Sequence, residues 1–263
     1  LAPVTSSARS GPEPDVVPVD GPEGPTAPTL PAATGPADPA SVRSWLEQAA
    51  EARRDGRLAA AVEWSDRAMR AVLDAAADRE LRAEAAQLRA LCLFQFGALH
   101  ALVDESATVL PILRADGPAA SLVRVMRAVC LAANETGQFG LALSLAQECQ
   151  QLAMGTGDRG LQSLALNALA CTFERLGDPW QGERLMAEAL ALAREHGQRA
   201  EILIALSNFT ALRIGRYYLL RDARGADEAR EPLVPALETA QEALVLAREQ
   251  GDPFPQVLIE GNL

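Results

Sequence analysis

The stretch LALNALACTFERLGDPWQGERLMAEALALAREHG, residues 164–197, decides the fold. It holds two apolar segments with helical spacing, separated by Gly177-Asp178 and followed at once by Pro179. Glycine is favoured just past the end of a helix, and proline in the first turn of the next one. The stretch therefore predicts two helices joined by a tight turn.

Glycines at the ends of predicted helices recur along the chain. Gly97, Gly137 and Gly177 follow one another at a constant step of about 40 residues, and Gly56 precedes Gly97 by nearly the same step. A fixed period of this size indicates helix pairs, each too small to bury its own apolar face, that stack on their neighbours. We therefore predict an all-α protein, a right-handed α-solenoid of antiparallel helix pairs. Such a scaffold offers a curved binding surface rather than one central pocket.

The composition divides the chain into two parts. Residues 1–40 are rich in Pro, Gly, Ala and Thr and lack a periodic apolar face, so we expect a disordered lead-in. Asp38-Pro39 is a suitable start for the first helix. The repeat array is predicted over residues 41–263. Its units lie near 41–80, 81–120, 121–160, 161–200, 201–254 and, truncated, 255–263.

Two features interrupt the regular spacing. The motif ALALAREHGQ, which begins at Ala189, returns as ALVLAREQGD only at Ala243, and this long step places a 14-residue insertion in the fifth unit near Arg221–Pro235. Pro111 falls inside the second helix of the second unit, where we expect it to kink or end that helix.

Charge and residue usage exclude several classes of protein. The net charge of −11 argues against non-specific binding to nucleic acid or to an anionic membrane. No apolar run approaches the roughly 20 residues of a membrane-spanning helix. Hydrophobic residues make up 49% of the chain but aromatic residues only 4%, so alanine and leucine must pack the helices. The first residue is Leu1 and no signal peptide is visible, so we expect a fragment or a trimmed product. Cysteines at small-residue positions of helices, buried and reduced, fit the cytoplasm.

The sequence contains no pattern typical of a metal site or of a catalytic site. The cysteines have no C-x-x-C spacing and the two histidines no partner ligands, so we predict neither metal nor cofactor, and cysteines that are buried and reduced. The chain has no glycine-rich phosphate loop, no G-x-S-x-G and no H-E-x-x-H. We do not expect an enzyme within these residues, although a domain beyond Leu263 could be one.

These residues resemble the tetratricopeptide repeat (TPR) family, in its long-helix form with units of about 40 residues. The resemblance is carried in the fourth unit by small and aromatic residues at the family's offsets: Leu166, Leu169-Ala170, Phe173, Gly177-Asp178, Gly182, Met186 and Ala189. It implies that Ala170 faces Gly182 across the helix pair. Armadillo and HEAT arrays share the period and remain the alternative, but they lack the Gly-Asp turn.

The ending A-L-x-L-A-R-E-x-G, at Ala189–Gln198 and again at Ala243–Asp252, is similar to repeats in bacterial signalling proteins. Those include GGDEF diguanylate cyclases, LuxR-type activators and adenylate cyclases. This resemblance implies a sensory or regulatory module that binds proteins or peptides, with an effector domain after Leu263. The alternatives are a free-standing adaptor and the regulatory part of a transcription activator, whose DNA-binding helices would lie outside this chain.

The resemblance also implies that the first helix of each pair lines the concave face. Positions on that face form a candidate site for a peptide carboxylate or an acidic segment. They are Arg124, Arg127, Asn134, Asn167, Arg175, Ser207, Asn208 and Tyr217. In the alternative interpretation Arg124, Arg127 and Arg175 are solvated and pair with Glu135, Glu174 or Asp178. A homodimer formed through the insertion around Arg221–Pro235 or through an uncapped terminal helix is a further option.

Overall fold

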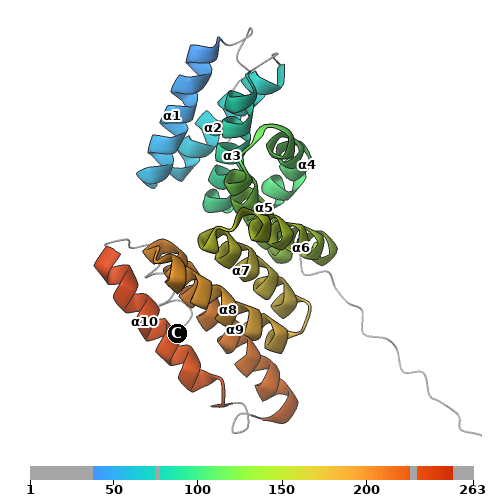
Figure 1. Ribbon diagram of the computed structural model, residues 1–263, viewed down its shortest axis with the longest axis vertical. Coiled ribbons are helices and arrows are strands. Elements are labelled where there is room, and N and C mark those ends of the chain that lie inside the picture. Colours follow the sequence, from blue (N-terminus) through green and yellow to red (C-terminus); the bar gives the residue numbers. More distant parts are fainter. Residues whose placement is uncertain (1–37, 75–77, 226–229, 251–263) are drawn as a thin grey trace, which may run out of the picture.

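The computed structural model describes residues 38–74, 78–225 and 230–250, and these residues form a TPR-like right-handed α-solenoid (Figure 1). The predicted lead-in, apart from residues 38–40, and the predicted last unit, 255–263, lie outside the described residues. Among the described helices, none has both the length and the apolar character needed to cross a membrane. The helices are α1 Pro39–Arg54, α2 Leu58–Asp74, α3 Arg79–Phe96, α4 Leu99–Asp116, α5 Ala119–Glu135, α6 Phe139–Thr156, α7 Arg159–Arg175, α8 Pro179–His196, α9 Arg199–Arg224 and α10 Leu233–Gln250.

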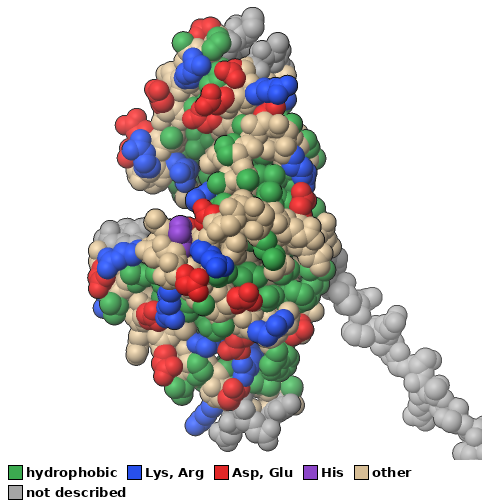
Figure 2. Space-filling model, in the orientation of Figure 1, with side chains coloured by type: hydrophobic (Ala, Val, Ile, Leu, Met, Phe, Trp, Pro, Cys, Tyr) green, Lys and Arg blue, Asp and Glu red, His purple; other side chains and the backbone are tan. Residues whose placement is uncertain are grey.

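The odd-numbered helices begin at 40-residue intervals, from Pro39 to Arg199. Each packs against its even-numbered partner and against the next odd-numbered helix, so α1, α3, α5, α7 and α9 form one continuous row. We call the exposed side of this row the inner wall. Figure 2 shows the surface hollowed between the part that carries α1 and the part that carries α10.

Local chemistry sets where the helices begin and end. The Asp38 carboxylate accepts hydrogen bonds from the backbone N–H groups of Ala40 and Ser41, both at 2.9 Å, and so caps α1 as predicted. Asp178 caps α8 by accepting from the Gln181 N–H at 3.0 Å. Gly177 between α7 and α8 has a φ of +86°, a conformation that side chains other than glycine adopt at a cost.

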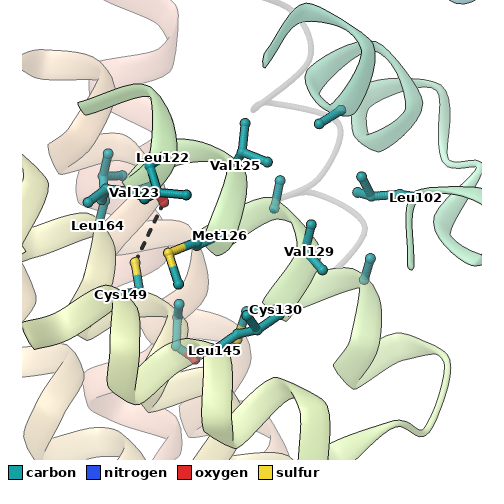
Figure 3. Close-up of a cluster of buried hydrophobic side chains, with 14 of the residues drawn as sticks. Leu102, Leu122, Val123, Val125, Met126, Val129, Cys130, Leu145, Cys149 and Leu164 are labelled. Carbon is teal, nitrogen blue, oxygen red and sulfur yellow. Dashed lines mark hydrogen bonds between the residues drawn. The ribbon is translucent and has the colours of Figure 1, made fainter. Parts of the chain in front are cut away.

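The core runs continuously through the array because each helix pair buries apolar side chains against the next. Figure 3 shows it around α5, where Val123, Met126 and Val129 are fully buried. Small residues allow helices to approach closely elsewhere. At Gly182 an added Cβ atom would lie 2.8 Å from the Ala170 carbonyl oxygen, which confirms the predicted contact between these two residues.

Both segments that interrupt the regular spacing contain unbroken helix. Of the two outcomes expected at Pro111, a kink or an end of the helix, the second is wrong, since α4 continues from Leu99 to Asp116. Part of the extra length of the fifth unit is helical, because α9 runs 26 residues and passes through Gly215 to Arg224. Arg216 holds the lengthened helix in place by pairing with Glu183 of α8 and with Glu231 before α10.

A buried arginine links the first two helix pairs. The Arg89 side chain is 5% exposed and forms a bidentate contact with Glu105, at 2.8 and 2.6 Å, while it also donates to the Val62 carbonyl at 3.1 Å. Asp66 lies 3.6 Å away. Breaking a charged hydrogen-bond network at this depth costs more stability than breaking a solvated ion pair.

We expect Gly182→Ala to destabilise the protein despite the higher helix propensity of alanine. The Ala170 backbone is the obstacle, and overpacking of this kind costs about 1–3 kcal/mol. Gly140 of α6 is a matched control because an added Cβ atom meets nothing within 4 Å there. Gly140→Ala should be neutral or stabilising in urea unfolding, and equal effects of the two substitutions would refute the close approach.

We expect Arg89→Met to lower the free energy of unfolding by about 2–4 kcal/mol, because it leaves Glu105 without its cation and the Val62 carbonyl without its donor. The control is Arg114→Met. Arg114 also makes a two-bond contact with a glutamate, Glu148, but both side chains are more than 40% exposed, so the loss should stay below about 1 kcal/mol. Chemical denaturation of both variants measures the difference.

Candidate ligand-binding wall

The 40-residue spacing of the odd-numbered helices assigns every inner-wall residue to a column with one member per helix. Contacts one period apart confirm these columns: Arg127 reaches Asn167, and Arg175 pairs with Glu135. The columns of Arg124, Arg127 and Leu131 form the middle of the wall. Their members are Ser44, Glu47 and Glu51 in α1; Glu84, Gln87 and Leu91 in α3; Arg124, Arg127 and Leu131 in α5; Leu164, Asn167 and Cys171 in α7; and Ile204, Ser207 and Ala211 in α9.

Three of the predicted site residues meet at the centre of the wall, and we call Arg127, Asn167 and Asn208 the central cluster. The Asn167 Oδ1 atom accepts a hydrogen bond from Asn208 Nδ2 at 2.9 Å and a longer one from Arg127 at 3.5 Å. The Asn167 Nδ2 atom lies 3.3 Å from the Met186 sulfur. Asn167 is only 1% exposed, so it orients its two neighbours instead of presenting its own amide at the surface.

Arg127 is a cation without a counter-charge in the described part of the chain. Its side chain is half-buried, and its Nε atom is enclosed without a hydrogen-bond partner. Burial lowers the pKa of the guanidinium, and the ionisable groups near enough to oppose that change are three cysteines. Since arginine nevertheless stays charged at neutral pH, this position favours an anion supplied from outside.

The three cysteines near Arg127 do not neutralise it. Burial raises the pKa of Cys171 and of Cys149 to about 12, and it also raises the pKa of Cys130. All three thiols are therefore neutral near pH 7. All four cysteines of the chain are reduced, and Cys171 is the one that is partly exposed, on the inner wall itself. Its exposure differs from the expectation that every cysteine is buried.

Asn134 lies in the core and not on the wall. It is 4% exposed and donates from Nδ2 to the Thr172 hydroxyl at 3.0 Å, while that hydroxyl donates to the Ala168 carbonyl at 2.9 Å. These bonds join α5 to α7. Asn134 therefore stabilises the contact between two helix pairs and cannot reach a ligand in this conformation.

Arg175 follows the alternative interpretation of its sequence. It pairs with Glu135 of the preceding helix pair and lies 3.5 Å from Glu174. Burial raises the pKa of Glu174, and the Arg175 charge opposes that rise. Arg175 is thus an exposed cation whose charge is already compensated.

Arg124 lies one helical turn from Arg127, in the neighbouring column of the wall. It is exposed and close enough to His196 for its charge to oppose protonation of the imidazole. The His196 Nδ1 atom lies 2.6 Å from Glu201 Oε2, and this hydrogen bond is the main reason that the pKa of His196 is raised. The pair joins the end of α8 to the start of α9 beside Gly160, where a Cβ atom would collide with the ring.

The last two predicted residues lie at different places on α9. Ser207 is half-buried in the Arg127 column. Tyr217 lies on the lengthened part of α9, nine residues beyond Asn208, and makes an edge-to-face contact with Tyr218 at 5.2 Å between ring centroids. At about 1.5 Å per residue this places Tyr217 well away from the central cluster.

Three acidic residues of the wall, Glu47, Glu51 and Glu84, were not among the predicted site residues. All three are exposed and occupy the columns of Arg127, Leu131 and Arg124. Extending the 40-residue spacing of the columns from α5 back to α3 and α1 locates these three residues on the wall. Among the described residues, no group of three or more His, Cys, Asp or Glu side chains is arranged to hold a metal ion.

Comparison with known proteins identifies the architecture. No protein-family model and no curated protein sequence matches the chain. A Rap protein complexed with competence and sporulation factor is similar in structure, with a TM-score of 0.68 and 13% identity over 85% of this chain and 58% of that one. RapI in its apo form gives a TM-score of 0.56 and 12% identity, over 83% and 57%.

A third similar structure has nearly identical TPR-like repeats, from a Podosopora anserina putative kinesin light chain. Its TM-score is 0.55 and its identity 16%, over 82% of this chain and 100% of that one. This chain therefore spans less than two thirds of the two Rap structures but matches the repeat protein over its full length. At these identities the likeness establishes the fold, a TPR-like helical repeat array.

Proposed function

We propose that the chain is a peptide-binding TPR-like module whose inner wall holds an extended segment carrying an acidic group at Arg127. The observation that carries this proposal is the guanidinium of Arg127, enclosed at Nε and without a counter-charge in the described residues. A carboxylate placed there would form charge-assisted hydrogen bonds, each worth about 1.5–3 kcal/mol. The carboxylate belongs either to an Asp or Glu side chain or to a free C-terminus.

The rest of the central cluster supports this role. One N–H of the Asn208 amide is used by Asn167, which leaves the second N–H and the carbonyl oxygen of a half-buried side chain. These two groups match the donor and acceptor of a peptide backbone. One of the similar Rap proteins forms a complex with competence and sporulation factor, which agrees with ligand binding by this fold.

The wider setting of the proposal is a recognition module of a bacterial signalling protein in the cytoplasm, such as a diguanylate cyclase. The repeated A-L-x-L-A-R-E-x-G ending favours this setting over a free-standing adaptor. The coding sequence after Leu263 separates the two, since a signalling domain supports the first and a stop codon the second.

Self-association belongs to the same proposal and involves the irregular end of the array. Tyr218 and Leu219 of α9 are about half exposed, as is Leu237 of α10. Exposed aromatic and aliphatic side chains of this kind are favoured at interfaces between subunits. Light scattering over a concentration series measures the oligomeric state.

Binding is tested with a bead-bound library of random eight-residue peptides, half with a free C-terminal carboxylate and half amidated. We expect the labelled chain to select peptides that contain Asp, Glu or a free carboxylate, and Arg127→Met to bind them at least about tenfold more weakly. Arg184→Met is the control, because Arg184 is exposed on the outer helix α8. Equal selection by Arg127→Met, or selection of no acidic peptides, would contradict the proposal.

The unliganded protein gives a second test. If Arg127 is retained for binding, its uncompensated charge destabilises the free fold, so Arg127→Met should raise the free energy of unfolding by about 1–3 kcal/mol. A residue needed for the fold would give the opposite sign. Urea unfolding of both proteins decides between them, and a loss of stability would argue for a structural role.

A further inference from the structure

Charge is distributed unevenly along the inner wall, and the column register shows how. In the three middle columns the first two helix pairs contribute Glu47, Glu51 and Glu84 and no cation. The third pair contributes Arg124 and Arg127 and no anion. The fourth and fifth pairs contribute uncharged side chains, mainly small or apolar. The wall thus changes from acidic to basic to neutral along the array.

These acidic side chains are available to a ligand. Glu47, Glu51 and Glu84 are each exposed, and within the described part of the chain none forms an ion pair or a hydrogen bond through its carboxylate. Elsewhere glutamates pair readily with arginine, as in Arg114–Glu148, Arg175–Glu135, Arg194–Glu242 and Arg199–Glu249. The charges of the first two helix pairs on the wall are therefore uncompensated.

A second, independent observation is the positive charge of Arg127, which also lacks a partner. Arg127 occupies the same column as Glu47, two helix pairs further along, and its enclosed Nε atom lacks a partner. Neither charge neutralises the other, since the ionisable groups that act on Arg127 are cysteines. One wall therefore presents two separated charges of opposite sign, each without a partner in the described residues.

We infer that the ligand is a dipolar segment, with a basic residue bound either by Glu84 or by Glu47 and Glu51, and its acidic group bound by Arg127. This inference rests on the proposed function, because it specifies the ligand of the same wall. Complementary charges fix the direction in which a segment lies, since the reversed segment would place like charges together. The neutral stretch on α9, where Ile204, Ser207 and Ala211 are at least partly exposed, then receives uncharged side chains.

The helix spacing gives the distance between the two charges. Packed helices lie about 8–10 Å apart, and α1 contacts α3 as α3 contacts α5. An extended peptide advances about 3.3 Å per residue. The basic residue should therefore lie about three residues from the acid when Glu84 binds it, and about five or six when Glu47 and Glu51 do.

The test uses the same peptide library, read for the position of Lys and Arg relative to the selected acid or C-terminal carboxylate. We expect basic residues to be enriched three to six positions away, on one side only. Glu47→Lys combined with Glu51→Lys should weaken binding of those peptides about tenfold and select Asp or Glu at the distant positions instead. Glu188→Lys with Glu238→Lys, both on outer helices, is the charge-matched control.

The outcomes separate this inference from the function on which it rests. Two outcomes overturn the dipolar ligand and leave the peptide-binding module standing. In the first, acidic peptides are selected with no preference for a basic residue. In the second, the Glu47→Lys, Glu51→Lys variant selects the same peptides as the unaltered chain. Selection of no acidic peptides overturns both. Circular dichroism of the double variant establishes that the exposed substitutions leave the helices intact.

Discussion

Close contact between helices that cannot bury their apolar faces alone is the constraint on which this structure depends. A single pair such as α7 and α8 cannot bury its own apolar face, so its stability depends on the pairs on either side. Contact at this distance requires small residues where helices cross, as at Gly182 against the Ala170 carbonyl. The row of odd-numbered helices, and with it the inner wall, follows from that packing.

Polar side chains fix the register that apolar packing leaves loose. Asn134 bonds to Thr172 between α5 and α7, and Asn208 bonds to Asn167 between α7 and α9. Each bond joins equivalent regions of successive helix pairs in a setting of low dielectric, where an unmade hydrogen bond is costly. A slip of one helix along the next would break these bonds. The wall is therefore a rigid surface on which the spacing of charges is set.

Much of the fold could be predicted because the residues that begin and end its helices act locally. Gly177 and Asp178 end one helix and cap the next through their own backbone and side-chain preferences, whatever surrounds them. The length of α9 could not be predicted, because Gly215 stands where other inner helices end and the helix continues through it. Tertiary contacts override this local signal, since Arg216 finds Glu183 and Glu231 only once α8 and the segment before α10 have packed.

The helix face that carries the candidate site could be predicted from the sequence, but the burial of each side chain on it could not. Spacing along a helix places Asn134, Asn167 and Arg127 near one another, yet two of these three side chains turn into contacts between pairs. How far a side chain is buried depends on the neighbouring helix, which no local pattern records. Burial also distinguishes Arg127 from an ordinary surface arginine. Solvated on a single helix, its charge would be ordinary, but between α5 and α7 it is enclosed among thiols that stay neutral.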